Sequence, residues 1–343
     1  MPRVANDTPA HPPSGTPSSP FHQGEQAMQA LAGVRERMDQ RAGRAIRDFM
    51  PEQHRAFFAG LPMLPLAAGS EDGWPVATIL TGAPGFAASP DPRTLRIAVP
   101  PDLAAPPGTR LVPGASVGLL GIAFETRRRN RLNGRVNRID AAGFDVAVVQ
   151  SFGNCAQYIQ ARHMEAQGTD AAPPPGAAGP TEELAGLDTA ARRLIAGADT
   201  LFVASSDRPS PDAALDLSHR GGRPGFLRLE GDVLSVPDFA GNRYFNTLGN
   251  FRCNPRAAVL LPDFATGALL HLAGPVELVH AGADLAAIRG AERLWRVRIS
   301  RAWRRPNGLP RAWSPPEPAP STSATGIWIE TPASLDAHGD RTA

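Results

Sequence analysis

The sequence predicts a mainly β chain with flanking helices, an α+β protein built from two similar halves. Short apolar segments recur along most of the chain, bounded by Gly, Pro and Asp-Gly, which is typical of strands rather than helices. A three-residue match also recurs: Pro84-Gly85-Phe86 returns as Pro224-Gly225-Phe226, and 224 minus 84 is 140. The segments give the class, and the match suggests that the class occurs twice.

The same spacing of 140 relates further residues, which strengthens the case for a repeat. The pairs are Phe124 with Phe264, Thr126 with Thr266, Leu132 with Leu272, Gly134 with Gly274, and Val136 with Val276. In each half a helix and a strand precede the first match in the same order. Several matches at one spacing indicate an internal duplication. Two such halves in one chain predict a pseudo-dimer.

The N-terminal part should be helical after an irregular start. Residues 1–20 are rich in Pro, Ser, Thr and Ala without periodicity and are expected to form a disordered tail. Residues 24–46 place Met28, Leu31, Val34 and Met38 at spacings of three and four, which predicts a helix. Pro51 suits the start of a short helix over Glu52–Leu61.

The first half is expected to span residues 21–165. Its predicted strands are Met63–Ala68, Val76–Leu80, Leu95–Val99, Val117–Phe124, Arg135–Ile139 and Phe144–Val149. Cys155–Met164 is expected to close it as a helix, with Asn154 as the N-cap in preference to a ligand contact. Residues 166–184 are rich in Ala, Pro and Gly and are expected to form a linker.

The second half is expected to span residues 185–305, followed by a Pro-rich tail over 306–343. Two apolar runs flank Glu230-Gly231-Asp232 and predict a hairpin. A helix should start near Arg243 and stop at Asn254-Pro255. The remaining expected elements are helices at Leu187–Ala198 and Asp284–Leu294 and strands at Thr200–Ser205, Ala213–Leu217, Trp295–Ala302 and Gly326–Glu330.

Composition favours a cytoplasmic protein with no nucleic-acid or membrane partner. The chain has 343 residues, enough for two domains, and a net charge of only +2. All its basic side chains apart from histidine are arginines, with no aromatic residues interleaved. No apolar run reaches membrane length, and the N-terminus has no secretory pattern. Cys155 and Cys253 stand far apart and suggest no metal site.

The stretch from Leu215 to Pro255 carries the best candidate site. A predicted strand ends in Ser218-His219-Arg220, and the following helix start offers Arg243, Asn246 and Thr247. Free backbone N–H groups and the positive end of the helix dipole attract anions, and arginine adds a bidentate contact. A phosphate monoester is the expected guest. The alternative is a surface hairpin and helix whose arginines only solvate the fold.

These motifs resemble a known family. The order SHRGG, PGF, PDFAGNRYFNTLGN and NPRAAVLL is similar to flavin-nucleotide-binding members of the pyridoxamine 5'-phosphate oxidase-like superfamily, which have the FMN-binding split β-barrel. The likeness covers about residues 21–305 and is sharpest over 216–276. It implies two tandem split barrels forming a pseudo-dimer with FMN in the groove between them, and leaves open a further homodimer.

The resemblance also implies roles for the candidate residues. Arg243 would contact the FMN phosphate, helped by groups near Asn246 and Thr247, and Ser218, His219 and Arg220 would line the ribityl and ring side. The reaction class is hydride or electron transfer to a redox substrate, with NAD(P)H as a possible donor. The first half has VATILTG and PPGTRLV in place of the two motifs, so it is expected to supply a wall or lid.

Several alternatives stay open at this point. Arg127-Arg128-Arg129-Asn130-Arg131 forms either an electropositive rim for a phosphorylated ligand or a solvated hairpin end. His219 is favoured as a cofactor contact over a general acid or base, and no catalytic residue is assigned. The competing functions are a flavin or haem carrier or sensor without turnover, and a structural module that has lost its cofactor.

Overall fold

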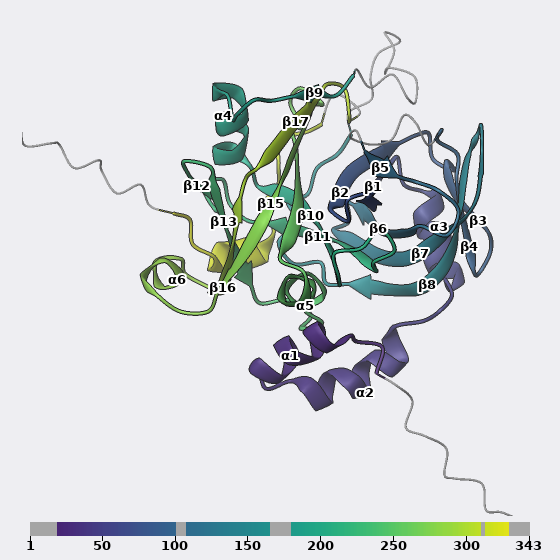
Figure 1. Cartoon of the computed structure of the whole chain (residues 1–343), viewed down its shortest axis with the longest axis horizontal. Coiled ribbons are helices and arrows are strands. Elements are labelled where there is room, and N and C mark those ends of the chain that lie inside the picture. The colour runs from purple at the N-terminus through teal and green to yellow at the C-terminus, as the bar shows by residue number, and fades with distance from the viewer. Residues whose placement is uncertain (1–18, 101–107, 165–179, 310–312, 329–343) are drawn as a thin grey trace, which may run out of the picture.

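The computed structural model describes residues 19–100, 108–164, 180–309 and 313–328. The expected tail over 1–20 and the linker over 166–184 lie mostly outside these residues, as does the end of the chain. Figure 1 shows two β units side by side, the first half in blue and teal and the second in green and yellow, with the first two helices beside α5.

The first half begins with three helices and continues as one antiparallel sheet. The helices are α1 (Gln23–Leu31), α2 (Arg35–Ala45) and α3 (Glu52–Ala59). The strands are β1 (Met63–Ser70), β2 (Pro75–Thr81), β3 (Ala87–Asp91), β4 (Thr94–Ile97), β5 (Thr109–Arg110), β6 (Ser116–Ala123), β7 (Arg128–Asp140) and β8 (Gly143–Asn154). The expected strands of this half are all present, with β7 and β8 longer than the apolar runs that predicted them.

The second half repeats a helix followed by a sheet. The helices are α4 (Thr189–Gly197), α5 (Asn246–Cys253), α6 (Ala283–Ala287) and a 3-10 turn, η2 (Pro320–Ala324). The strands are β9 (Glu182–Glu183), β10 (Thr200–Ser206), β11 (Leu215–Gly221), β12 (Arg228–Glu230), β13 (Val233–Phe239), β14 (Arg256–Pro262), β15 (Leu269–Val279), β16 (Ala291–Arg298) and β17 (Arg301–Arg305). The hairpin around Glu230-Gly231-Asp232 is confirmed as β12 and β13.

The two sheets share one strand order, which confirms the tandem split-barrel fold class. The first runs β2-β1-β6-β7-β8-β4-β3 and the second β11-β10-β14-β15-β16-β13-β12, so each strand has a counterpart at the same place. The register agrees as well. Leu119 pairs with Leu132 in the first sheet, and Val259 pairs with Leu272 in the second, each 140 residues later. The repeat in the sequence is therefore a repeat in the fold.

Each half has its own apolar core, and a third core joins them. Phe58, Phe144 and their neighbours fill the first half, and Phe226, Trp295 and their neighbours fill the second. The joining core takes side chains from both halves, among them Ile79, Leu120, Phe202, Leu217 and Leu260. Removing this much apolar surface from water stabilises the pairing of the two halves in one molecule.

The N-terminal helix α1 fixes the position of α5. A Cβ at Gly24 would lie 2.2 Å from the carbonyl oxygen of Gly249, so only a glycine pair allows this approach. Glu25, next to that contact, is only 4% exposed and accepts a hydrogen bond from Asn246, the first residue of α5. Because α5 starts at the candidate site, α1 supports the site from behind.

Four local predictions are wrong. Residues 24–46 form two helices, since the chain turns between Leu31 and Arg35. Residues 155–164 form turns and isolated bridges to Glu317 and Trp313 instead of a helix, so Asn154 ends β8 and caps nothing. The helix expected over 284–294 stops at Ala287 and strand β16 follows, because pairing with β13 and β15 outweighs the helical periodicity. Residues 326–328 form no strand, and 329–330 lie outside the described part.

The C-terminal segment packs against the first half. Ala319 is 2% exposed, and its N–H donates to the side-chain oxygen of Gln160 at 2.9 Å. Arg127 donates to the carbonyl oxygen of Glu317 at 3.2 Å. The domain boundaries at 21–165 and 185–305 stay a prediction. No helix in the described residues is both long and apolar enough to cross a membrane.

Candidate functional site

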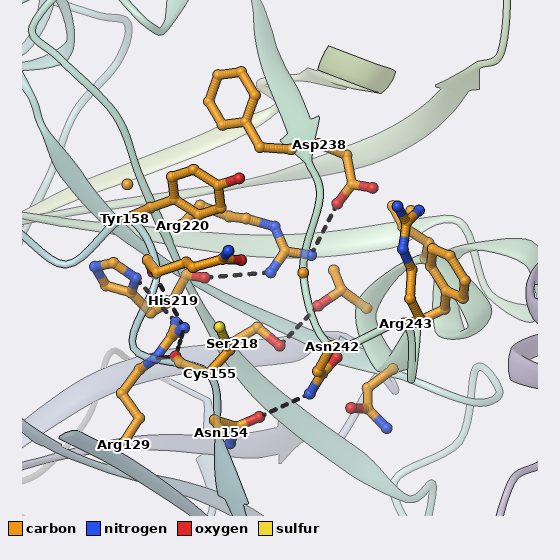
Figure 2. A pocket seen from close by; sticks show the side chains of 18 of the residues that line it. Arg129, Asn154, Cys155, Tyr158, Ser218, His219, Arg220, Asp238, Asn242 and Arg243 are labelled. Atoms are coloured by element: carbon orange, nitrogen blue, oxygen red, sulfur yellow. Dashed lines mark hydrogen bonds and ion pairs between the residues drawn. The ribbon is translucent and has the colours of Figure 1, made fainter. Parts of the chain in front are cut away.

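A pocket lies where the second half's β11 and α5 meet the first half's β7 and the segment after β8 (Figure 2). It holds about 820 Å³ of empty space, the solvent at its mouth included, which is in the range of small-molecule sites. The sequence-predicted residues that line it are Ser218, His219, Arg220, Arg243, Asn246 and Thr247. The structure therefore brings all six to one cavity.

The side chains of β11 alternate between two neighbours of the strand. Ser218 faces α5, where the Thr247 hydroxyl donates to its Oγ at 2.9 Å. Arg220, on the same face, lies 3.5 Å from Asp238 at the end of β13. His219 points to the other side, where Arg129 of β7 approaches its Nδ1 at 3.1 Å. The period of two thus makes one strand a link between both halves.

Arg129 is a buried cation without an acidic partner. Its guanidinium donates to the carbonyl oxygens of Cys155 and Gln157 and to His219, and no carboxylate in the described residues pairs with it. Burial lowers the pKa of Arg129 to about 10, and the nearby charges of Arg220 and Arg131 act in the same direction, so it is still charged at neutral pH. A buried charge of this kind calls for a counter-ion.

His219 is held neutral by its surroundings. Burial lowers the pKa of this imidazole well below its ordinary value, and the charges of Arg129 and Arg220 act in the same direction. Because arginine can only donate, Nδ1 must accept and Nε2 must carry the proton. That Nε2 is buried and has no partner. His219 therefore offers one N–H donor.

The start of α5 supplies backbone donors. Asn246, Thr247 and Leu248 all line the pocket, and the first N–H groups of a helix have no carbonyl within it to bond. Arg243 and Phe245, just before the helix, have φ angles of 67° and 60°. Such left-handed residues cost free energy and tend to occur at binding sites. The side-chain amide of Asn246 itself is engaged with Glu25.

Arg243 is already paired in the structure. Both terminal nitrogens of its guanidinium contact the carboxylate of Glu292 on β16. Glu292 also accepts from Arg293 at 3.1 Å. In Figure 2 Arg243 lies on the opposite side of the pocket from His219 and Arg129. Contact between Arg243 and a ligand would therefore require the ion pair with Glu292 to open.

A buried polar network backs the pocket. Arg131 donates to Asp216 at 2.6 Å and to the carbonyl oxygen of Leu217 at 2.7 Å. Asp216 also accepts from Asn250 of α5 at 2.9 Å. Burial raises the pKa of the neighbouring Glu25 to about 8, and the charge of Asp216 adds to the shift. The network connects β7, β11, α5 and α1.

Taken together, the lining favours an anion. Four arginines line the pocket against two carboxylates, Asp238 and Glu292. Burial raises the pKa of Asp238, although Arg220 and Arg293 oppose this. Four buried donor nitrogens have no partner: Arg131 Nε, Asn154 Nδ2, His219 Nε2 and Arg220 Nε. Unsatisfied buried donors are uncommon and mark places where a ligand or water binds.

Several lining residues were not among the predicted ones. They are Arg129, Arg131, Asn154, Cys155, Tyr158, Asp238 and Glu292. The arginine run over 127–131 was a signal for the first two, since alternate residues of β7 reach the pocket. Tyr158, whose hydroxyl donates to the carbonyl oxygen of Ala240 at 3.0 Å, carried no signal because only tertiary contacts bring it there. The described residues contain no cluster suited to a metal ion.

Comparison with known proteins gives distant structural similarities. No protein-family model matches the chain, and no curated protein matches it. Solved structures that resemble part of it include HupZ from Group A Streptococcus, at 15% identity and a TM-score of 0.27, covering 35% of this chain and 94% of that one. At these values the similarities assign no activity.

Two further solved structures match about the same share of the chain. A putative pyridoxamine 5'-phosphate oxidase from Lactobacillus delbrueckii is 12% identical with a TM-score of 0.28, covering 35% of this chain and 98% of that one. A FAD-binding protein from Mesorhizobium loti is 13% identical with a TM-score of 0.26, covering 36% and 96%. Each spans little more than a third of this chain.

Proposed function

We propose that the chain is an FMN-binding flavoprotein whose phosphate-bearing cofactor is held in the pocket between the two halves. The observation that carries this proposal is Arg129, a buried guanidinium that has no carboxylate partner among the described residues and faces the same cavity as the start of α5. A phosphate ester supplies the missing charge and accepts from several donors at once. The six predicted contacts and Arg129 then form one binding site.

The residues present suit such a group. Arg129, Arg220 and the first-turn N–H groups of α5 would hold the phosphate, with Arg243 joining them once released from Glu292. The Nε2–H of His219 would donate to the remainder of the ligand. Bound FMN would supply the hydride or electron transfer, with NAD(P)H as the proposed donor, and the protein would supply the seat and the electrostatics.

The tautomer of His219 favours flavin over haem. Iron ligation through Nε2 needs an unprotonated Nε2 and therefore a proton on Nδ1. A proton on Nδ1 would face the N–H of Arg129 at 3.1 Å, which places two donors against each other. His219 is thus suited to donate to an acceptor on the cofactor. This supports the flavin alternative among the carrier and enzyme hypotheses.

The absorbance spectrum of the purified protein, with and without added FMN, tests the proposal. We expect a flavin spectrum, and we expect Arg129→Leu to weaken FMN binding about 10- to 100-fold, as the loss of a charged contact predicts. Arg138→Leu is the matched control, because Arg138 lies on the same strand with its side chain 69% exposed. A colourless protein that takes up no FMN, or an unaffected Arg129→Leu variant that is folded by circular dichroism, would refute the proposal.

Turnover is tested separately by adding NADH or NADPH to the loaded protein under anaerobic conditions. Loss of the flavin colour would support the oxidoreductase over the carrier, because a carrier has no reason to accept hydride. Retained colour with both donors would leave flavin binding intact and contradict NAD(P)H as the donor.

A further inference from the structure

The duplication creates two related grooves between the halves, and they can be compared residue by residue. Ser218 pairs across β11 and β10 with Val203, and Val203 pairs with Val259 of β14. In the first half Thr78 pairs with Leu66, and Leu66 pairs with Leu119 of β6. Thr78 is therefore the structural counterpart of Ser218, 140 residues earlier.

A contact across the interface confirms this correspondence. Arg131 of β7 donates to the carbonyl oxygen of Leu217 in the other half at 2.7 Å. His271 of β15, 140 residues later, bonds through Nδ1 to the carbonyl oxygen of Ala77 at 2.9 Å. Ala77 in turn precedes Leu217 by 140. The two halves thus face each other through equivalent residues, and the residues of β7 and β11 in the pocket have known twins.

The twin groove has lost the cations of the pocket. Its residues at the positions of His219, Arg220, Arg129 and Arg131 are Ile79, Leu80, Leu269 and His271. Burial lowers the pKa of His271 to about 4, so it is neutral at physiological pH. The stretch that corresponds in sequence to Arg243–Thr247 lies outside the described residues, and it contains no basic residue.

Apolar side chains fill the place where an anion would sit. Ile79, Leu80, Leu269 and Leu309 are each 2% exposed or less. Ile79, Leu269 and Leu309 belong to the core that joins the halves. The cation nearby is Arg305, which is also buried and reaches the Thr78 hydroxyl at 3.4 Å. One arginine replaces the four of the pocket, and core side chains occupy the space.

The hollow beside the twin groove does not offer a substitute. It is lined by Trp74, Trp303 and the apolar faces of β2, β14 and β15, with His271 and Arg301 as its basic residues. His271 is neutral there, and Arg301 lies 3.3 Å from the carboxylate of Asp72. A doubly charged phosphate would lose its hydration in this apolar place without gaining a free cation, which is strongly unfavourable.

We propose that the chain binds one phosphate-bearing cofactor, in the pocket formed by β11, α5 and β7, and that the twin groove has become the apolar contact that holds the halves together. The inference rests on the proposed function and goes beyond it, because it fixes the stoichiometry and assigns the two grooves different tasks. A homodimer of single barrels would need both grooves to be alike. Fusion into one chain lets the two sequences diverge.

The test is the number of FMN molecules bound per full-length chain, measured by calorimetric titration and by native mass spectrometry. We expect one. Two matched variants assign the groove: Arg129→Leu gives the pocket the residue found in its twin, and Thr78→Val removes the twin groove's hydroxyl at nearly constant volume. Arg129→Leu should weaken the single binding event about 10- to 100-fold, and Thr78→Val should keep both the count and the affinity.

The outcomes separate this inference from the proposed function. Two FMN molecules per chain, or a full equivalent retained at parental affinity by Arg129→Leu, would overturn the inference while leaving flavin binding in place. Weakening by Thr78→Val in a folded protein would show that the wrong groove was chosen. Absence of any FMN binding by the parent would instead refute the proposed function, and the inference with it.

Discussion

Replacing Glu25 with glutamine should remove much of the pH dependence of stability near neutrality. Glu25 is 4% exposed, its pKa is raised to about 8 by burial and then by the charge of Asp216, and its ordinary value is 4.5. The folded protein therefore prefers the protonated acid. The stabilisation is fully present below the unfolded pKa and is lost as the pH rises through the folded value.

The size of the effect follows from the shift. One pKa unit corresponds to about 1.4 kcal/mol, so the free energy of unfolding should fall by roughly 3 kcal/mol, as an upper limit, between about pH 5 and about pH 8. Glutamine keeps the shape and the acceptor for Asn246, and it is also accepted at this position of a helix N-terminus. The variant should be the more stable protein at the higher pH.

The assay is urea unfolding followed by tryptophan fluorescence at both pH values, for the parent and the variant. Comparing the two proteins cancels the contributions of other titrating groups. The reasoning would be refuted if parent and variant lost the same free energy of unfolding between the two pH values, since Glu25 would then titrate alike in both states. A variant destabilised equally at both values would show instead that packing of α1 on α5 was disturbed.

Two further predictions concern the phosphate seat and the helix behind it. Arg243→Ala should weaken FMN binding about 10-fold or more, whereas Glu292→Gln should strengthen it because Arg243 is released; titration of the two variants with FMN checks this, and equal affinities would contradict a role for Arg243. Gly24→Ala should cost roughly 1–3 kcal/mol, because its Cβ would meet Gly249 at 2.2 Å, whereas Gly43→Ala, with no atom within 4 Å, should gain about 0.5–1 kcal/mol in urea unfolding.

The sequence was informative where local pattern and final structure depend on the same interactions. Alternating apolar runs gave the strands, and turn residues such as Glu230-Gly231-Asp232 gave the hairpin, because both are decided within a few residues. The spacing of 140 gave the repeated sheet order, since equivalent residues face equivalent neighbours. The six predicted contacts share one pocket because β11 and α5 belong to the same half and frame its edge.

Tertiary contacts decided the rest. Residues 155–164 were expected to be helical, but they bond to the C-terminal segment, more than a hundred residues away in sequence. Local periodicity similarly suggested a helix where pairing with β13 and β15 makes β16 a strand. No local pattern contains such partners.

By itself, then, the sequence determined the fold class, its duplication and the half that carries the anion-binding motifs. Only the tertiary structure decided that the first half contributes Arg129 and Arg131, that Glu292 holds Arg243, and that leucines occupy the second groove. The physical reason is that a charge acts on whatever lies within a few ångströms of it. Which groups these are depends on how the two halves pack together.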